Sequence, residues 1–163
     1  MAKNFYYEFA VWEPLRSVLV NNANDELAAL DNSLEAIFTF DIPTRVVSSD
    51  SPAVYLDWEE CDLKKSDDDS YCEQSHTFRC DVAVFGSDFR ELDLRASQYL
   101  LAINRAFDKM TIADFVTTSA ELNAIRWEVT KRADVGFTKN RETGLFRRDA
   151  SLILVVQFLE VIS

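Results

Sequence analysis

Three cysteines and the one histidine offer the first chemistry to consider, because together they would make a zinc-binding set. Cys61, Cys72, His76 and Cys80 supply the three thiolates and one imidazole of a common structural zinc site. Their spacing differs from that of such sites, since gaps of three residues flank the histidine in place of a short CxxC knuckle. Cys80 also alternates with apolar neighbours such as Phe78, which is typical of one face of a strand. We therefore expect Cys80 to be a buried core thiol, and we expect no metal.

The other polar residues form no recognisable catalytic set. A Cys–His or Ser–His pair would have to use His76, which stands at the entrance of a strand beside an acidic stretch, a position typical of a solvated or edge histidine. The glycine-rich phosphate-binding patterns and the HExxH zinc pattern do not occur. Asp67, Asp68 and Asp69 could hold a hard cation, but the spaced ligands of a calcium loop are missing, so we expect a solvated loop. The sequence predicts a protein that is not an enzyme and that uses no cofactor.

Length and composition indicate one globular domain with an acidic excess. The chain has 163 residues, of which 48% are hydrophobic, with three glycines and three prolines, so disordered and collagen-like classes are excluded. The net charge of −11 argues against nonspecific binding to nucleic acid or to an anionic membrane. An odd number of cysteines and a polar N-terminal segment without a signal core indicate a cytosolic, reducing setting.

The spacing of apolar residues predicts two helices that would position these groups. The first is an amphipathic stripe that begins at Pro14, in the first turn, and runs to about Phe40, with a kink or restart near Asn24. The second is the clearest, because Asp88 can serve as its N-cap and Glu91 can complete a capping box. This helix covers residues 88–110, and its apolar stripe consists of Phe89, Leu92, Ala96, Tyr99, Leu100, Ile103, Phe107 and Met110.

Alternating apolar residues predict the strands of one sheet. Strands are expected at 45–47, 53–58 and 76–85, around an inward-facing Trp127 with Ile125 and Val129, and from Ala150 to Ile162. A polar acidic loop at 59–74 and a polar basic arm at 132–148 separate them. We expect a single domain of the α+β class: one mixed, mostly antiparallel sheet with two main helices packed on one face, plus a long arm or hairpin.

Two polar segments of opposite charge interrupt this pattern. Residues 57–73 carry a net charge of −6, and residues 131–148 carry a net charge of +4. Segments of this length are either mobile solvated loops or functional ones. In the functional interpretation, the acidic loop of one copy meets the basic arm of the next, and such heterologous contacts can close a ring. Phe137, Leu145 and Phe146 lie within the basic segment and would form the apolar centre of that contact.

The order of these segments resembles that of the tail terminator, or tail completion, proteins of long-tailed bacteriophages. The likeness is one of layout and covers most of the chain. It comprises, in order, the helix EPLRSVLVNNANDELAALDNSLEAIF, the strand PAVYLDWEE, a polar hairpin, the strand HTFRCDVAVFG, the helix DLRASQYLLAINRAF, a long arm, and the ending RRDASLILVVQFLEVI. The proline-led strand and the arm followed by RRDASLILVV are the most suggestive parts.

This resemblance implies a structural virion protein, expected as a hexameric ring in the neck of the particle and assembled in the host cytoplasm. One ring face would bind the tail-tube protein and the other the head-completion protein, while DNA passes through an acidic lumen without specific binding. By family position, the basic arm would reach a neighbouring copy or the tube. From this position and the charge pattern, the expected interface residues are Asp67, Asp68, Asp69, Phe137, Arg141, Phe146, Arg147 and Arg148.

Three other interpretations stay open at this point. A head–tail connector or head-closure protein differs only in which partner it binds. A small acidic inhibitor, such as an immunity protein that caps a basic nuclease, fits the net charge of −11 but not the basic arm. A small α+β enzyme is disfavoured by the missing catalytic set.

Overall fold

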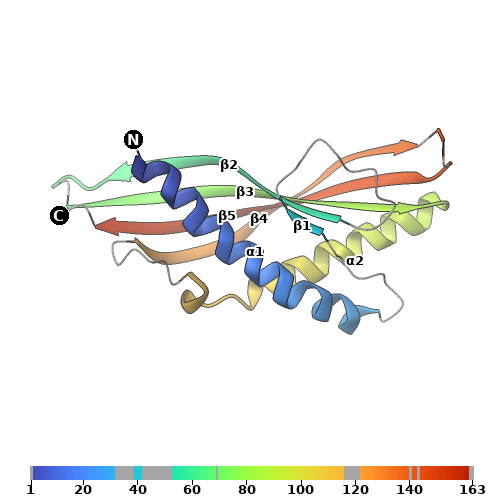
Figure 1. Cartoon of the computed structure of the whole chain (residues 1–163), viewed down its shortest axis with the longest axis horizontal. Coiled ribbons are helices and arrows are strands. Elements are labelled where there is room, and N and C mark those ends of the chain that lie inside the picture. The colour runs from blue at the N-terminus through green and yellow to red at the C-terminus, as the bar shows by residue number, and fades with distance from the viewer. Residues whose placement is uncertain are drawn as a thin grey trace.

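The structure of the chain is a computed structural model that describes residues 2–31, 39–41, 53–68, 70–115, 122–139, 141–142 and 144–161. Its elements in chain order are α1 (Ala2–Leu30), β1 (Thr39–Asp41), β2 (Ala53–Lys65), β3 (Tyr71–Gly86), α2 (Phe89–Asp108), the 3-10 helix η1 (Ile112–Phe115), β4 (Leu122–Lys139) and β5 (Phe146–Val161) (Figure 1).

The strands form one twisted sheet in the order β1-β2-β3-β5-β4. β1 is parallel to β2, whereas β2–β3, β3–β5 and β4–β5 are antiparallel pairs. β3 and β5 pair over their full length, from Tyr71 opposite Val161 to Gly86 opposite Phe146. The molecule is therefore elongated along the strands (Figure 1), and the predicted mixed, mostly antiparallel sheet is confirmed.

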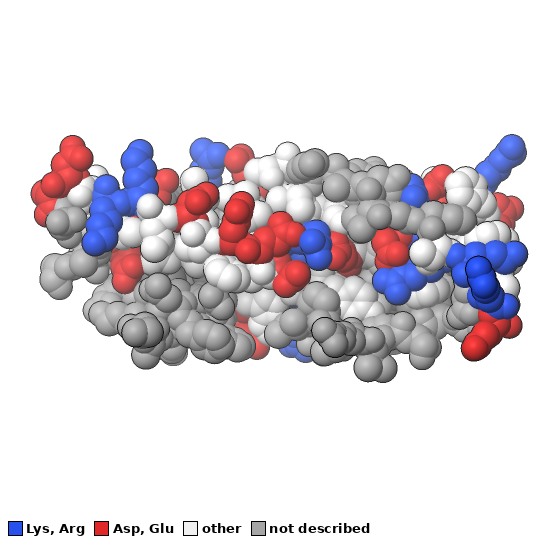
Figure 2. All heavy atoms as spheres, turned by 90° about the horizontal axis from the view of Figure 1, so that it is seen from above, with Lys and Arg blue, Asp and Glu red and all other residues white. Residues whose placement is uncertain are grey.

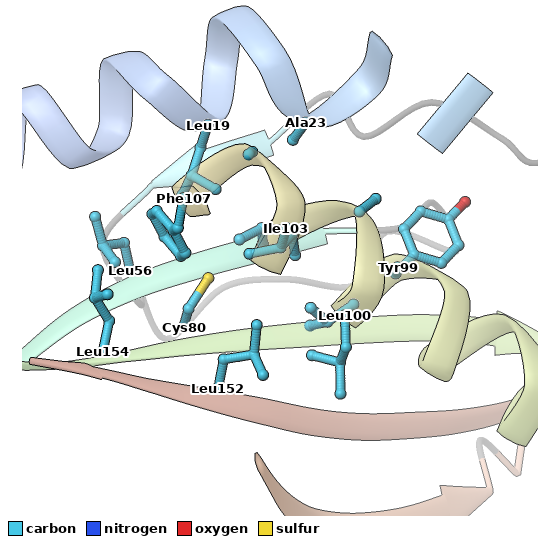
Figure 3. Packing of buried hydrophobic residues seen from close by; sticks show 14 of the residues in the cluster. Leu19, Ala23, Leu56, Cys80, Tyr99, Leu100, Ile103, Phe107, Leu152 and Leu154 are labelled. Carbon is cyan, nitrogen blue, oxygen red and sulfur yellow. The ribbon is translucent and has the colours of Figure 1, made fainter. Parts of the chain in front are cut away.

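Both helices pack on one face of this sheet, as the sequence predicts, and the core lies between them and the strands (Figure 3). Every second residue of β3 and β5 points into this core, which is the period of two expected for strands with one covered face. The strand residues include Phe78, Cys80, Val82, Val84, Leu152, Leu154, Val156 and Phe158. We call this side of the sheet the helix-covered face and the other side the open face. The open face is itself buried at one place, where Ala53, Tyr55 and Ala83 form a second, small cluster with Phe85 packed against it.

Helix α2 agrees closely with its prediction. The Asp88 carboxylate accepts hydrogen bonds from the backbone N–H groups of Arg90 (2.8 Å) and Glu91 (3.4 Å), which satisfies donors that the first turn leaves free. The predicted apolar stripe is buried from Leu92 to Met110. Phe89, in the first turn, is the exception, because it is 49% exposed.

Helix α1 differs from its prediction at both ends and in the middle. It begins at Ala2, so Pro14 lies within the helix and not in its first turn, and it ends at Leu30. The expected kink near Asn24 is wrong, because the helix runs through this stretch without a break. Burial of Ala23 and Leu27 against the core outweighs the weak helix propensity of the asparagines. The end of the predicted helix includes the strand β1, while residues 32–38 and the strand expected at 45–47 lie outside the described residues.

The two segments interpreted as loops are mostly strand, which corrects both boundaries. β2 continues to Lys65 and β3 begins at Tyr71, so the acidic loop shrinks to the turn between them. β4 extends to Lys139 and β5 begins at Phe146, so the basic arm is the end of a β-hairpin. Ladder hydrogen bonds join backbone groups whatever the side chains are, so strands can continue where the side chains on both faces are polar. There the apolar alternation that signals a strand disappears.

Candidate interaction interface

The two charged hairpin turns lie at opposite ends of the sheet (Figure 1). We call the turn between β2 and β3 the acidic tip (residues 66–70) and the end of the β4–β5 hairpin the basic tip (residues 139–146). Residues 62–73 around the first carry a net charge of −3, and residues 138–148 around the second carry +3. A strand of 16 residues such as β3 spans about 50 Å. Figure 2 shows both blue and red side chains at each end of the molecule.

In the acidic tip, the Asp68 carboxylate accepts hydrogen bonds from other residues of the same turn. Its Oδ1 accepts hydrogen bonds from the hydroxyls of Ser66 and Ser70, both at 2.7 Å, and from the backbone N–H of Ser70 at 3.1 Å. The bonds from Ser70 and then Ser66 lower the pKa of Asp68 to about 2. Asp67 is exposed, and Asp69 lies outside the described residues. Asp68 therefore orders the turn, while Asp67 faces solvent.

In and next to the basic tip, four cations differ in how they are held. Arg141 is exposed, and Lys139 Nζ lies 5.2 Å from the centre of the partly buried Phe146 ring. Arg147 and Arg148 instead form ion pairs within the chain, at 2.7 Å with Asp149 and at 2.9 Å with Asp93 of α2. The backbone of Phe137 belongs to β4, and its side chain lies outside the described residues. Of the predicted contact arginines, Arg141 is therefore the one most open to a partner.

The structure separates the residues of the possible zinc set. Cys72, His76 and Cys80 lie on one face of β3, and residues four apart in a strand are about 13 Å apart. Cys80 is fully buried in the core, as predicted, and burial raises the pKa of its thiol. Of the three cysteines, only Cys61 lies beside His76, with 3.6 Å between Sγ and Nε2. No group of three or more metal-binding side chains occurs among the described residues.

His76 is buried on β3, an inner strand of the sheet, so the expectation of a solvated or edge histidine is wrong. Its Nδ1 accepts a hydrogen bond from Trp58 Nε1 at 3.2 Å, which places the ring proton on Nε2. Nε2–H then donates to Gln74 Oε1 at 2.9 Å, and Gln74 Nε2 donates to Glu160 Oε2 at 2.6 Å. The Cys61 thiol therefore meets an N–H donor and not a base, and this arrangement does not activate a nucleophile.

The open face carries most of the charge of the strands. By register, it presents eight carboxylates and four cations with described side chains, a clear acidic excess. These are Asp57, Glu59, Glu60, Asp62, Glu73, Asp81, Glu128 and Asp149, with Lys64, Arg79, Arg126 and Arg147. The sequence analysis did not predict this surface. The period of two would have placed its residues in β3 and β5 on one side, but in β2 a bulge between Trp58 and Glu60 breaks that period.

Both long edges of the sheet lack a partner strand in the part of the chain that the structure describes. β1 covers only Ala53–Tyr55 of β2, so the rest of β2 is an edge, and β4 forms the opposite edge along its whole length. β4 contains three register shifts against β5, between Ala124 and Arg126, Val129 and Lys131, and Asp134 and Gly136. Such bulges bend and twist a strand. Trp127 and Val129 lie on this edge and pack only partly against the core.

Comparisons with known proteins do not identify a family for this chain. No family model and no curated protein matches the chain. One chain of the solved structure titled "Virion of native gene transfer agent (GTA) particle" aligns at 14% identity with a TM-score of 0.42, covering 85% of this chain and 92% of that one. At this TM-score and identity, the likeness establishes neither a shared fold nor a shared role. No helix in the described residues has the length and apolar character needed to cross a lipid bilayer.

Proposed function

We propose that this chain is a structural virion protein, the tail terminator of a long-tailed bacteriophage. In this role a ring of copies caps the tail tube and joins it to the head-completion proteins. The order of helices and strands that resembles this family is one support. The observation that carries the proposal is the long sheet itself. In the described residues it has helices on one face only, and most of β2 and the whole of β4 have no partner strand at its two edges.

This sheet can be continued by further copies of itself. Strand direction alternates along β2-β3-β5-β4, so the two edge strands run in opposite directions. A second copy placed by rotation about an axis along the strands brings its β2 antiparallel to this β4, which extends the alternation. Closing such a sheet removes its unpaired edges, and the bulges in β4 supply curvature of the kind that closure needs. The helices would lie outside, and the acidic open face would line the lumen.

The positions of the tips fit two different ring faces. In an edge-to-edge ring, all acidic tips lie on one face and all basic tips on the other, so the two faces suit different partners. A ring closed by contact between the acidic and basic tips of neighbours, the arrangement that the charge pattern first suggested, would leave the β4 edge unpaired. We therefore favour closure through the strand edges and assign the exposed Arg141 and Asp67 to contacts with partners.

Light scattering at low and moderate salt tests the ring. A particle of about six times 18.7 kDa at both salt concentrations is expected, because backbone pairing between edges is little screened by ions. If the chain is a monomer at both, binding to a tail-tube protein decides, since a terminator can assemble on its tube. A monomer that binds no tail-tube protein contradicts the proposal, and one that binds only a head-completion protein favours the head-closure alternative.

A further inference from the structure

The arginines of the open face are held by acidic residues in a repeated arrangement. Three strands each carry an arginine followed two residues later by an aspartate or glutamate, and residues two apart in a strand point to the same side. In each pair the guanidinium contacts the carboxylate: Arg79 and Asp81 at 2.9 Å in β3, Arg126 and Glu128 at 2.7 Å in β4, and Arg147 and Asp149 at 2.7 Å in β5. We call these the three arginine clamps.

Two of the clamps are reinforced by further contacts. Arg79 also reaches Glu59 at 2.8 Å and Asp57 at 3.5 Å across the strand pair, and the Ser151 hydroxyl donates to Asp81 Oδ1 at 2.7 Å. Arg147 donates from Nε to both oxygens of Asp149, at 2.8 and 3.0 Å, while its guanidinium lies 5.8 Å from the centre of the Phe85 ring. The hydrogen-bonding donors of these two arginines are thus directed to groups within the chain.

The clamps account for arginines on a face that carries an acidic excess. Carboxylates crowded on one face repel one another, and an arginine among them offsets that repulsion. A free arginine, however, is also the side chain best suited to grip a phosphate with two parallel hydrogen bonds. A guanidinium whose N–H groups already donate to a carboxylate cannot bind a phosphate in this way.

We propose that the three arginine clamps make the open face a surface along which duplex DNA passes without being held. This inference rests on the proposed function, in which the open face lines the lumen. In this inference Asp81, Glu128 and Asp149 have a function of their own. Each of them prevents the arginine that it contacts from binding the phosphate backbone of DNA. Loss of these carboxylates, and not of other open-face acids, should convert the face into a DNA-binding surface.

The test compares two triple variants with the same change in charge. The clamp variant carries Asp81→Asn, Glu128→Gln and Asp149→Asn. The control variant carries Glu60→Gln, Asp62→Asn and Glu73→Gln, three open-face acids for which no arginine contact is found within the described part of the chain. Fluorescence anisotropy with a labelled DNA duplex of random sequence should show no binding by wild type or control. The clamp variant should bind at least about tenfold more tightly than the control. Its salt slope should be about −1.8, as phosphate contacts by Arg126 and Arg147 imply, because Arg79 still contacts Glu59 and Asp57.

Equal DNA binding by the clamp and control variants would overturn the inference, and so would binding by the wild type. Adding Arg79→Gln, Arg126→Gln and Arg147→Gln to the clamp variant should abolish the gained affinity. The change Asp81→Asn keeps an oxygen that can accept the hydrogen bond from the Ser151 hydroxyl. If the triple variant does not fold, the single variant Glu128→Gln, which lies on the edge strand β4, tests one clamp. Light scattering of the same samples separates the two proposals. A hexameric wild type without a clamp effect overturns this inference alone, whereas a monomeric wild type that binds no tail-tube protein counts against the ring and, with it, against passage of DNA along the open face.

Discussion

At the scale of single residues, His76 has the surroundings with the largest thermodynamic consequence. It is buried between Trp58 and Phe158, with ring contacts to both, and accepts the Trp58 N–H on Nδ1. Burial lowers its pKa to about 4, because a charged imidazole would lose its hydration in this place. The sequence could not show this, since the polar residues around position 76 gave no sign that β5 and β2 enclose it.

This shift predicts that stability falls in mild acid. Below its unfolded pKa of about 6.5, His76 is protonated in the unfolded chain. In the folded chain it stays neutral until the pH falls to about 4. The contribution of His76 to stability is therefore complete above pH 6.5 and is lost progressively between pH 6.5 and about 4. From about pH 7.5 to about pH 5 the free energy of unfolding should drop by about 2 kcal/mol. Urea unfolding at the two pH values measures the change.

The variant His76→Gln provides the control for this prediction. Glutamine keeps a neutral donor and acceptor but does not titrate, so its stability should change much less between the same pH values. An equal pH dependence in the wild type and the variant would show that His76 does not cause the loss, and that the carboxylates of this acidic chain do.

At the scale of elements, the apolar pattern predicted the helix and strand segments that are buried in the core. It did not predict the strand segments whose side chains are polar and which only backbone hydrogen bonds hold in the sheet. The alternation through Phe78 and Cys80 and the stripe from Leu92 to Phe107 were read correctly, because burial on one side leaves a period in the sequence. Lys64 and Glu73, by contrast, pair in a regular ladder although neither strand is apolar there. The extent of β2, β3 and β4 was therefore underestimated, and with it the open face.

Helix α2 offers a prediction at this scale through its N-cap. Replacing Asp88 by alanine removes the acceptor for two backbone N–H groups of the first turn, so the free energy of unfolding should fall by about 1 kcal/mol. Asp88→Ser should restore most of it. Asp108→Ala, the same change at the other end of the helix, should alter stability by less than about 0.5 kcal/mol, since a carboxylate there opposes the helix dipole. Urea unfolding that ranks the two alanine variants equally would contradict this role of Asp88.

At the scale of the whole molecule, the question is which surfaces meet when copies assemble. Asp62 of β2 pairs with Ser75, Ser75 with Gln157, and Gln157 with Arg126 of β4. Asp62 and Arg126 thus stand at the same level on opposite edges of one sheet, and both are exposed. In an edge-to-edge ring they come close between neighbouring copies. In a tip-to-tip ring, Asp67 and Arg141 come close instead.

Cysteine crosslinking distinguishes these two arrangements. In a Cys61→Ser background, which removes the one native thiol that is not buried, one variant carries Asp62→Cys with Arg126→Cys and the other carries Asp67→Cys with Arg141→Cys. With a short bifunctional maleimide, we expect the edge variant to give a ladder of crosslinked species that ends at the hexamer. The tip variant should stay uncrosslinked, because its cysteines lie on opposite faces of the ring, about one strand length apart. The reverse result would place the ring contact at the tips, so that the unpaired β4 edge would need another partner and the open face would not enclose a lumen.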